Sequence, residues 1–150
     1  MAVSRRRLAA IVAAAIVTAM ACDTPTPTAP SVVVANLTGT WSGPASDTSG
    51  PGQMTWQITQ EGSAFSGTLT LIETTANARG RGSVSGTLAG SAVTFTISVP
   101  AGGFDAPYQS CSSTASGTGR VTRSSIIGTY TGSSSCGGAI YSGQLSLVPQ

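Results

Sequence analysis

The sequence predicts an all-β protein: an eight-stranded, antiparallel, up-and-down β-barrel over residues 36–150, preceded by a signal peptide and a Pro/Thr linker. Apolar and hydroxyl residues alternate with period two along several segments, as in strands with one buried face. No stretch after the signal peptide has helical periodicity. Short and longer connections alternate along the chain, which favours a meander of hairpins. Eight strands close naturally into a barrel whose interior is just filled or holds one small ligand.

The N-terminal segment, residues 1–21, has the features of an export signal. Three arginines at 5–7 precede an apolar run at 8–20 that is too short to span a bilayer as a mature helix. Ala19-Met20-Ala21 then supplies a small-residue cleavage site. Cys22 directly after this site resembles the lipobox of bacterial lipoproteins, which implies that Cys22 becomes the new N-terminus and carries acyl chains such as palmitate. Plain secretion after Ala21 is the alternative.

Residues 22–35 form a linker that starts at the lipidated cysteine. Its alternating Thr and Pro residues disfavour helix and suit a semi-rigid spacer of ~3.1 Å per residue. We therefore expect an exported domain that is anchored through lipid to a bacterial membrane, on its periplasmic or cell-surface side. The choice between inner and outer membrane stays open.

Charge and composition exclude several functions. After residue 21, four arginines face five acids, so the net charge there is about −1. No basic stripe is present for nucleic acid. The chain has no His, which excludes a Ser-His-Asp triad and a His-ligated zinc site. We expect no metal and no cofactor. Glu61 and Glu73 are predicted at opposite barrel ends, too far apart to work as a glycosidase pair, so we do not expect an enzyme.

The eight strands are expected in the segments between turn signals. Gly is repeatedly followed by Thr in these segments, as at Gly67, Gly86, Gly117 and Gly128, and we expect the glycines to relieve strongly bent strands while Thr faces outward. The predicted strands are 37–43, 53–60, 64–72, 82–89, 92–99, 110–121, 126–133 and 139–148.

The connections distinguish the two ends of the barrel. Tight hairpins are expected at 61–63, at 89–91 and around 123–124. The longer connections, 44–52, 73–81 and 100–109, would then meet at the other rim. Both ends of the barrel domain would lie at the tight-turn end, so the open rim faces away from the membrane.

Cys111 and Cys136 are predicted to form a disulfide. In an exported chain whose third cysteine carries lipid, these two remain to pair. If Arg123-Ser124 is a two-residue turn, the hairpin register also places Cys111 opposite Cys136, at a separation compatible with a cross-strand bridge.

Leu37-Thr38-Gly39-Thr40-Trp41 resembles the G-x-W start of the calycin barrels, the lipocalins and avidins. The resemblance implies a calycin-like barrel in which Trp41 packs across one end. The second lipocalin motif is absent, and no arginine follows Arg123 to take the place of the late arginine that packs on this Trp in the family.

The leading functional hypothesis is an envelope lipoprotein whose lipocalin-like barrel binds a small apolar ligand. A protein-binding envelope module, such as a protease inhibitor, is the alternative. Inward aromatics are also ordinary core residues, and an aromatic loop can simply cap a barrel. The candidate ligand-binding residues are an inward series with two loop aromatics above it: Trp56, Leu71, Val84, Val99, Phe104 and Tyr108.

Overall fold

A computed structural model describes residues 35–150 of the chain. The predicted signal peptide, Cys22 and all but the last residue of the predicted linker lie outside the described residues. Strand and turn structure accounts for the described part, which contains no helix and therefore none that could span a bilayer.

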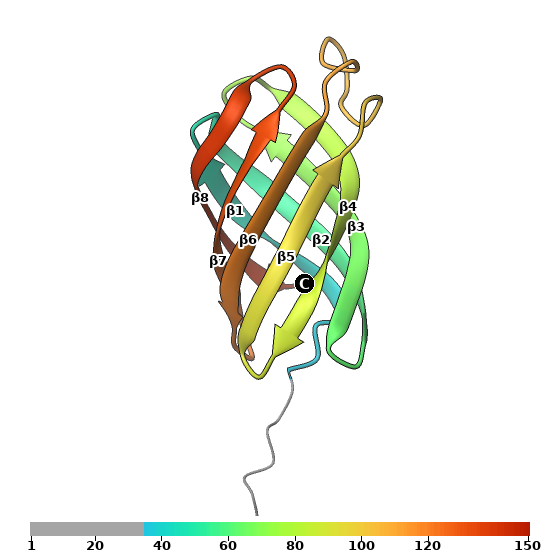
Figure 1. The fold of residues 1–150 in the computed structure, drawn as a ribbon, viewed down its shortest axis with the longest axis vertical. Coiled ribbons are helices and arrows are strands. Elements are labelled where there is room, and N and C mark those ends of the chain that lie inside the picture. Colours follow the sequence, from blue (N-terminus) through green and yellow to red (C-terminus); the bar gives the residue numbers. More distant parts are fainter. Residues whose placement is uncertain (1–34) are drawn as a thin grey trace, which may run out of the picture. The chain divides into compact units, whose positions relative to one another are not determined.

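Within residues 35–150, eight antiparallel strands close into an up-and-down barrel, which confirms the predicted fold class (Figure 1). Each strand pairs with its neighbours in the chain, and β1 pairs with β8 to close the sheet. The strands are β1 (Gly39–Asp47), β2 (Gly50–Glu61), β3 (Ala64–Glu73), β4 (Ala78–Ala89), β5 (Ala92–Val99), β6 (Ser113–Val121), β7 (Ile126–Ser134) and β8 (Gly138–Pro149).

The predicted long connections are too long at two of three places. The β1–β2 connection is a two-residue turn at Thr48-Ser49 rather than a loop over 44–52, and the β3–β4 connection spans only 74–77. Only the β5–β6 connection, residues 100–112, is a long loop, and it projects from the barrel end opposite the C-terminus (Figure 1). The three connections do share one rim, because the strands form a simple meander.

β1 and β2 extend further than expected and include Pro44 and Pro51. Proline lacks the N–H that a central strand needs, so it normally argues against a strand. Here the pairing between β1 and β8 is interrupted at Gly43 and Pro44, between the Ser42–Val148 and Ala45–Leu145 pairs. Pro51 lies beside the turn, next to the β1–β2 hairpin end. Both prolines thus occupy positions where the ladder is already incomplete.

The barrel half nearer its termini is tightly packed. Leu37 precedes β1 and is completely buried, and its carbonyl accepts a hydrogen bond from the indole Nε1 of Trp41 at 2.8 Å. The backbone N–H of Leu37 donates to Gln60 Oε1 at 2.7 Å. Further in, Trp56 meets Phe95 edge to face, with ring centroids 5.2 Å apart. Bulky side chains from opposed strands therefore meet across the interior and close this end.

Several glycines of the Gly-Thr pattern lie beneath aromatic rings. A Cβ on Gly86 would lie 2.6 Å from the Phe65 ring, and one on Gly117 would collide with the Phe95 ring. The cross-strand neighbour of each such glycine is thus free to lay its ring over the backbone. The following threonines, Thr87 and Thr118, are exposed on the outer face. The glycines therefore make room for core aromatics rather than only relieving strand bend.

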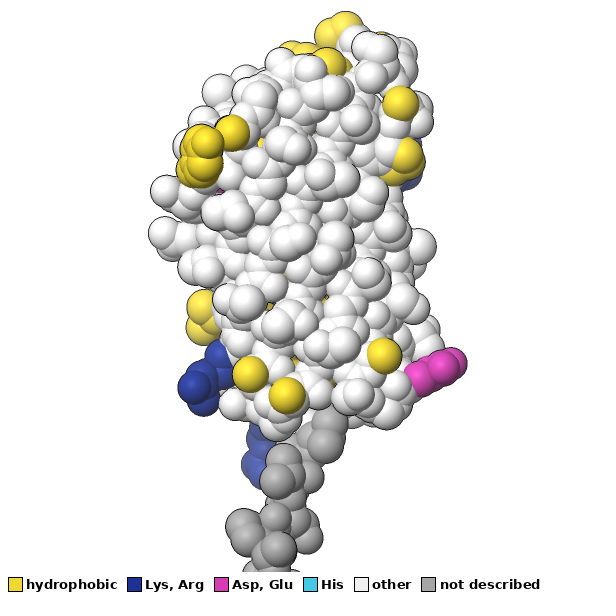
Figure 2. Space-filling model, in the orientation of Figure 1, with side chains coloured by type: hydrophobic (Ala, Val, Ile, Leu, Met, Phe, Trp, Pro, Cys, Tyr) yellow, Lys and Arg dark blue, Asp and Glu magenta, His cyan; other side chains and the backbone are white. Residues whose placement is uncertain are grey.

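The outer surface is built mainly from uncharged hydroxyl and glycine residues, and the face in Figure 2 carries very few charged side chains. Cross-strand rows such as Thr87, Thr94, Thr118 and Thr129 follow the register around β4 to β7.

Candidate ligand-binding cavity

The loop end of the barrel contains a cavity of about 400 Å³, within the ~300–1,000 Å³ typical of small-molecule sites. Its walls come from several strands and from the connections at this rim, including the β5–β6 loop. The apolar side chains that line it include Met54, Leu71, Ile97, Val99, Phe104 and Ile140. The barrel is thus packed at one end and hollow at the other.

Small residues create this space. Ala78 and Ala115 line the cavity at buried wall positions where the opposite half of the barrel carries Trp, Phe or Leu. Ser113 and Ser134 also face it near the rim. Because these side chains do not reach the barrel axis, the interior between them stays unfilled.

The β5–β6 loop folds back onto β4 and forms one side of the cavity mouth. The backbone N–H of Arg81 donates to the Gly103 carbonyl at 2.8 Å, and the N–H of Asp105 donates to the Arg79 carbonyl at 2.9 Å. Between these bonds, Phe104 pairs with Gly80, where a Cβ would lie 2.8 Å from the phenyl ring. The absence of a side chain at Gly80 therefore lets Phe104 lie against the barrel wall and line the cavity.

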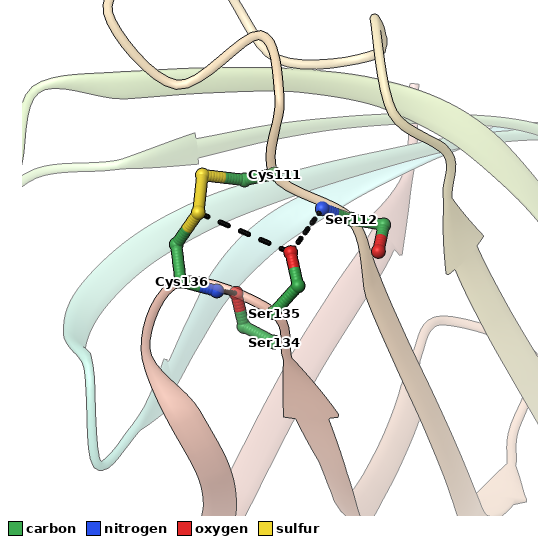
Figure 3. The surroundings of a disulfide bond; sticks show 5 residues. All are labelled: Cys111, Ser112, Ser134, Ser135 and Cys136. Carbon is green, nitrogen blue, oxygen red and sulfur yellow. Dashed lines mark hydrogen bonds between the residues drawn. A yellow bond between two sulfur atoms is a disulfide. The ribbon is translucent and has the colours of Figure 1, made fainter.

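The predicted disulfide between Cys111 and Cys136 is present, with the Cα atoms 5.6 Å apart (Figure 3). The β6–β7 register places the two residues opposite each other, just beyond the strand ends. Ser112 N–H also donates to Ser135 Oγ at 2.9 Å beside the bridge. The disulfide thus fastens the end of the β5–β6 loop to the β7–β8 connection, and both cysteines line the cavity.

A polar cluster formed by Asp47, Glu73 and Tyr130 lies at the cavity wall. The phenol of Tyr130, which is only 4% exposed, donates to Asp47 Oδ2 at 2.8 Å. The backbone N–H of Ser49 donates to Asp47 Oδ1 at 2.7 Å. Asp47 is therefore held in place from both sides, by a buried hydroxyl and by its own turn.

The cluster perturbs its own protonation. Burial, and secondly the negative charge of Asp47, raise the pKa of Glu73, while a hydrogen bond from the Ala76 backbone opposes the rise. Burial also raises the pKa of Tyr130 far above its usual value, and its hydrogen bond to Asp47 and the charges of Asp47 and Glu73 act in the same direction. The two carboxylates thus repel each other at the mouth of an apolar space.

A bulge and a glycine position Tyr130. The β7–β8 register shifts between Tyr130 and Gly132, and Ser142 has a positive φ of 54° at this irregularity. A Cβ on Gly143 would lie only 2.5 Å from the Tyr130 ring, so the ring occupies the space left by that glycine. The bulge also directs Tyr141 outward, and its N–H donates to Thr48 Oγ1 at 3.2 Å, which ties β8 to the β1–β2 turn.

Four of the six predicted ligand-binding residues line the cavity: Leu71, Val99, Phe104 and Tyr108. Trp56 and Val84 do not. Both are buried inward residues, but they belong to the filled half, where Trp56 packs on Phe95. Inward direction alone did not distinguish wall positions near the rim from core positions.

The sequence analysis did not identify Asp47, Glu73 or Tyr130 as site residues. Asp47 falls in the loop predicted at 44–52, whereas in the structure it is the last residue of β1. Its carboxylate points toward Tyr130, which lies on β7. The sequence signal for Asp47 is the two-residue alternation of β1. If the strand is continued through Pro44, Asp47 lies on the same face as Trp41 and Ala45. Glu61 and Glu73 lie at opposite ends of the β2–β3 hairpin, as predicted.

Among residues 35–150, no group of three or more His, Cys, Asp or Glu side chains is arranged to hold a metal ion. The site is a mainly apolar cavity bordered by two carboxylates and a phenol. The fold and the site together define a closed eight-stranded β-barrel with a hollow end. Comparison with family models, curated proteins and solved structures found no match for the chain.

Proposed function

We propose that the protein is a membrane-anchored bacterial envelope lipoprotein whose lipocalin-like barrel binds a small apolar ligand. The observation that carries the binding role is the cavity of about 400 Å³ at the loop end, lined mostly by apolar side chains. An apolar space of this size forgoes side-chain packing that a filled barrel interior would have.

The position of Trp41 supports the calycin-like part of the proposal. The resemblance implied that this Trp packs across one barrel end, and Trp41 is buried at the closed end with its indole N–H on the Leu37 carbonyl. The closed antiparallel meander agrees with the same class.

The termini of the barrel support the membrane-anchored part. Ala35 and the C-terminal end of the last strand lie at the closed end, where the N–H of Gln150 donates to the Thr40 carbonyl at 3.0 Å. A linker that begins at a lipidated Cys22 would join the barrel at this end, which leaves the cavity mouth free for ligand.

The alternative of a protein-binding module has less support. Protein-binding loops usually present exposed aromatic anchors. Phe104 and Tyr108 are instead half-buried and line the cavity. Their placement suits a loop that covers a ligand.

Binding of the uncharged apolar dye N-phenyl-naphthylamine, followed by its fluorescence, tests the proposal. The wild-type barrel should bind the dye, and Ala115→Leu, which fills the cavity wall, should weaken binding roughly tenfold or more. The control is Ala92→Leu, an exposed alanine at the closed end of β5. Equal binding by both variants and wild type would place the dye elsewhere and contradict the proposal.

A further inference from the structure

The charges around the cavity have a single sign. Asp47 and Glu73 are the charged residues among those that line it. The four arginines of residues 35–150 lie elsewhere: Arg79 and Arg81 are exposed on the outside of β4, Arg120 donates to Ser91 at the closed end, and Arg123 is in the β6–β7 turn.

The two carboxylates have no cationic partner within the described chain. The one ion pair among residues 35–150 joins Arg81 to Asp105 at 3.1 Å, on the outer side of the β5–β6 loop. Asp47 is held instead by a phenol and a backbone N–H, both neutral donors. These bonds orient the carboxylate at the cavity wall without neutralising it.

A pair of acids on an open surface would be solvated and would not indicate a ligand. Here the acids border an apolar cavity, and Tyr130, which fixes one of them, is itself buried and lines the same cavity. A bound group with positive charge would relieve the repulsion between Asp47 and Glu73, whereas a negative group would increase it. The same cavity therefore attracts one class of apolar ligand and rejects another.

We propose that the ligand is an apolar amine: a hydrocarbon body that fills the cavity and a protonated amino group that lies at Asp47 and Glu73. This inference rests on the proposed function, and it specifies the chemistry of the ligand. An alkyl carboxylate of the same size is disfavoured because its charge would face two carboxylates with no arginine at the cavity wall.

Competition against the dye tests the inference with three compounds that share one alkyl chain: decylamine, decanol and decanoate. At neutral pH the wild type should bind decylamine roughly tenfold more tightly than decanol, and decanoate more weakly than decanol by a similar factor. Raising the salt concentration should reduce both differences in affinity, that of decylamine from decanol and that of decanoate from decanol, because the carboxylates are partly exposed.

The variant Asp47→Asn with Glu73→Gln should bring the three affinities to within about threefold of one another. Glu61→Gln is the matched control, since it removes one acid at the closed end, and it should keep the wild-type order. Far-UV circular dichroism checks that each variant is folded. If a variant does not fold, the order of the three affinities in the wild type, and its change with salt, still tests the inference.

The outcomes separate the two proposals. If neither the dye nor any alkyl compound binds, the proposed function fails. If decanol binds but decylamine gains nothing over it, or if decanoate binds best, the cavity is a ligand site and only the amine inference is overturned. A preference for the amine that persists in the folded double variant would also overturn it.

Discussion

At the residue scale, Tyr130 connects the barrel wall to the cavity chemistry. Its ring lies over Gly143 of β8. Its hydroxyl donates to Asp47 of β1, the strand on the other side of β8. The same side chain therefore packs on β8 and orients a carboxylate of β1. A phenol in this position can donate to Asp47 only while it is protonated.

We predict that Tyr130 resists ionisation at alkaline pH. Burial and the nearby carboxylates raise the pKa of Tyr130 above the ordinary value of 10.0. The folded chain should keep this proton while the unfolded chain loses it, so the stability that Tyr130 contributes is present below pH 10 and declines as the pH rises further. The difference in absorbance at about 295 nm between wild type and Tyr130→Phe isolates this one phenol. Tyr141→Phe, which removes the phenol of a residue that is 61% exposed, is the spectroscopic reference. A Tyr130 difference curve centred at pH 10 would contradict the described cluster.

At the element scale, the β5–β6 loop is the part of the fold that shapes the mouth. It is attached twice: by backbone hydrogen bonds to β4 around Phe104, and by the disulfide to the β7–β8 connection. Long loops are usually mobile and variable. These two attachments on opposite sides of the barrel hold this loop over the cavity.

Removing the disulfide should lower stability substantially. Cys111 and Cys136 are 25 residues apart, and a crosslink of this span is worth about 3–4 kcal/mol on the chain-entropy account. We expect the double variant Cys111→Ala with Cys136→Ala to lose about that much free energy of unfolding in urea. Peptide mapping without reductant should recover the linked pair from the wild type. An unchanged urea midpoint would mean that the bridge does not constrain the loop end.

Much of the fold could be predicted at this scale, for identifiable reasons. The alternation in segments such as 54–58 and 93–99 survives in the structure because one face of each strand is buried and the other is solvated. The predicted pairing of Cys111 opposite Cys136 is correct because no bulge interrupts the β6–β7 hairpin between the cysteines and the turn. The length of β1 was wrong because Pro44 and Gly43 are poor strand residues, and only the incomplete β1–β8 ladder makes them acceptable.

The candidate site could be predicted only in part. Leu71 and Val99 follow from strand alternation, and Phe104 and Tyr108 from their place in a loop at the rim. The boundary between filled and hollow halves depends on which side chains meet across the barrel, such as Trp56 with Phe95, and this is a distance between strands far apart in sequence. The Asp47–Tyr130 bond likewise joins residues 83 positions apart.

At the scale of the whole molecule, the barrel has two unlike ends. The closed end contains Leu37 and Trp41 and receives both ends of the described chain, while the other end carries the cavity, its loop and two carboxylates. Attachment through the closed end would leave the cavity end accessible. This arrangement is compatible with the proposed anchoring.

The proposed anchor predicts a clear fractionation result. Two or more acyl chains hold a protein stably on a membrane, whereas an unlipidated barrel with a polar surface has no such anchor. In a bacterial host that processes lipoproteins, Cys22→Ser should therefore move the protein from the membrane fraction to the soluble fraction. Cys111→Ala with Cys136→Ala is the matched cysteine control and should stay on the membrane. A wild-type protein that is soluble, with an unmodified N-terminal cysteine, would contradict the proposal.

A crystal structure of the protein grown with decylamine tests most directly whether the hollow end of the barrel is a ligand site. We expect electron density for the alkyl chain between Leu71, Ile97 and Val99, with the amino group at Asp47 and Glu73. Ligand density found only on the outer surface, with the cavity filled by rearranged side chains, would show that the hollow end is not a ligand site.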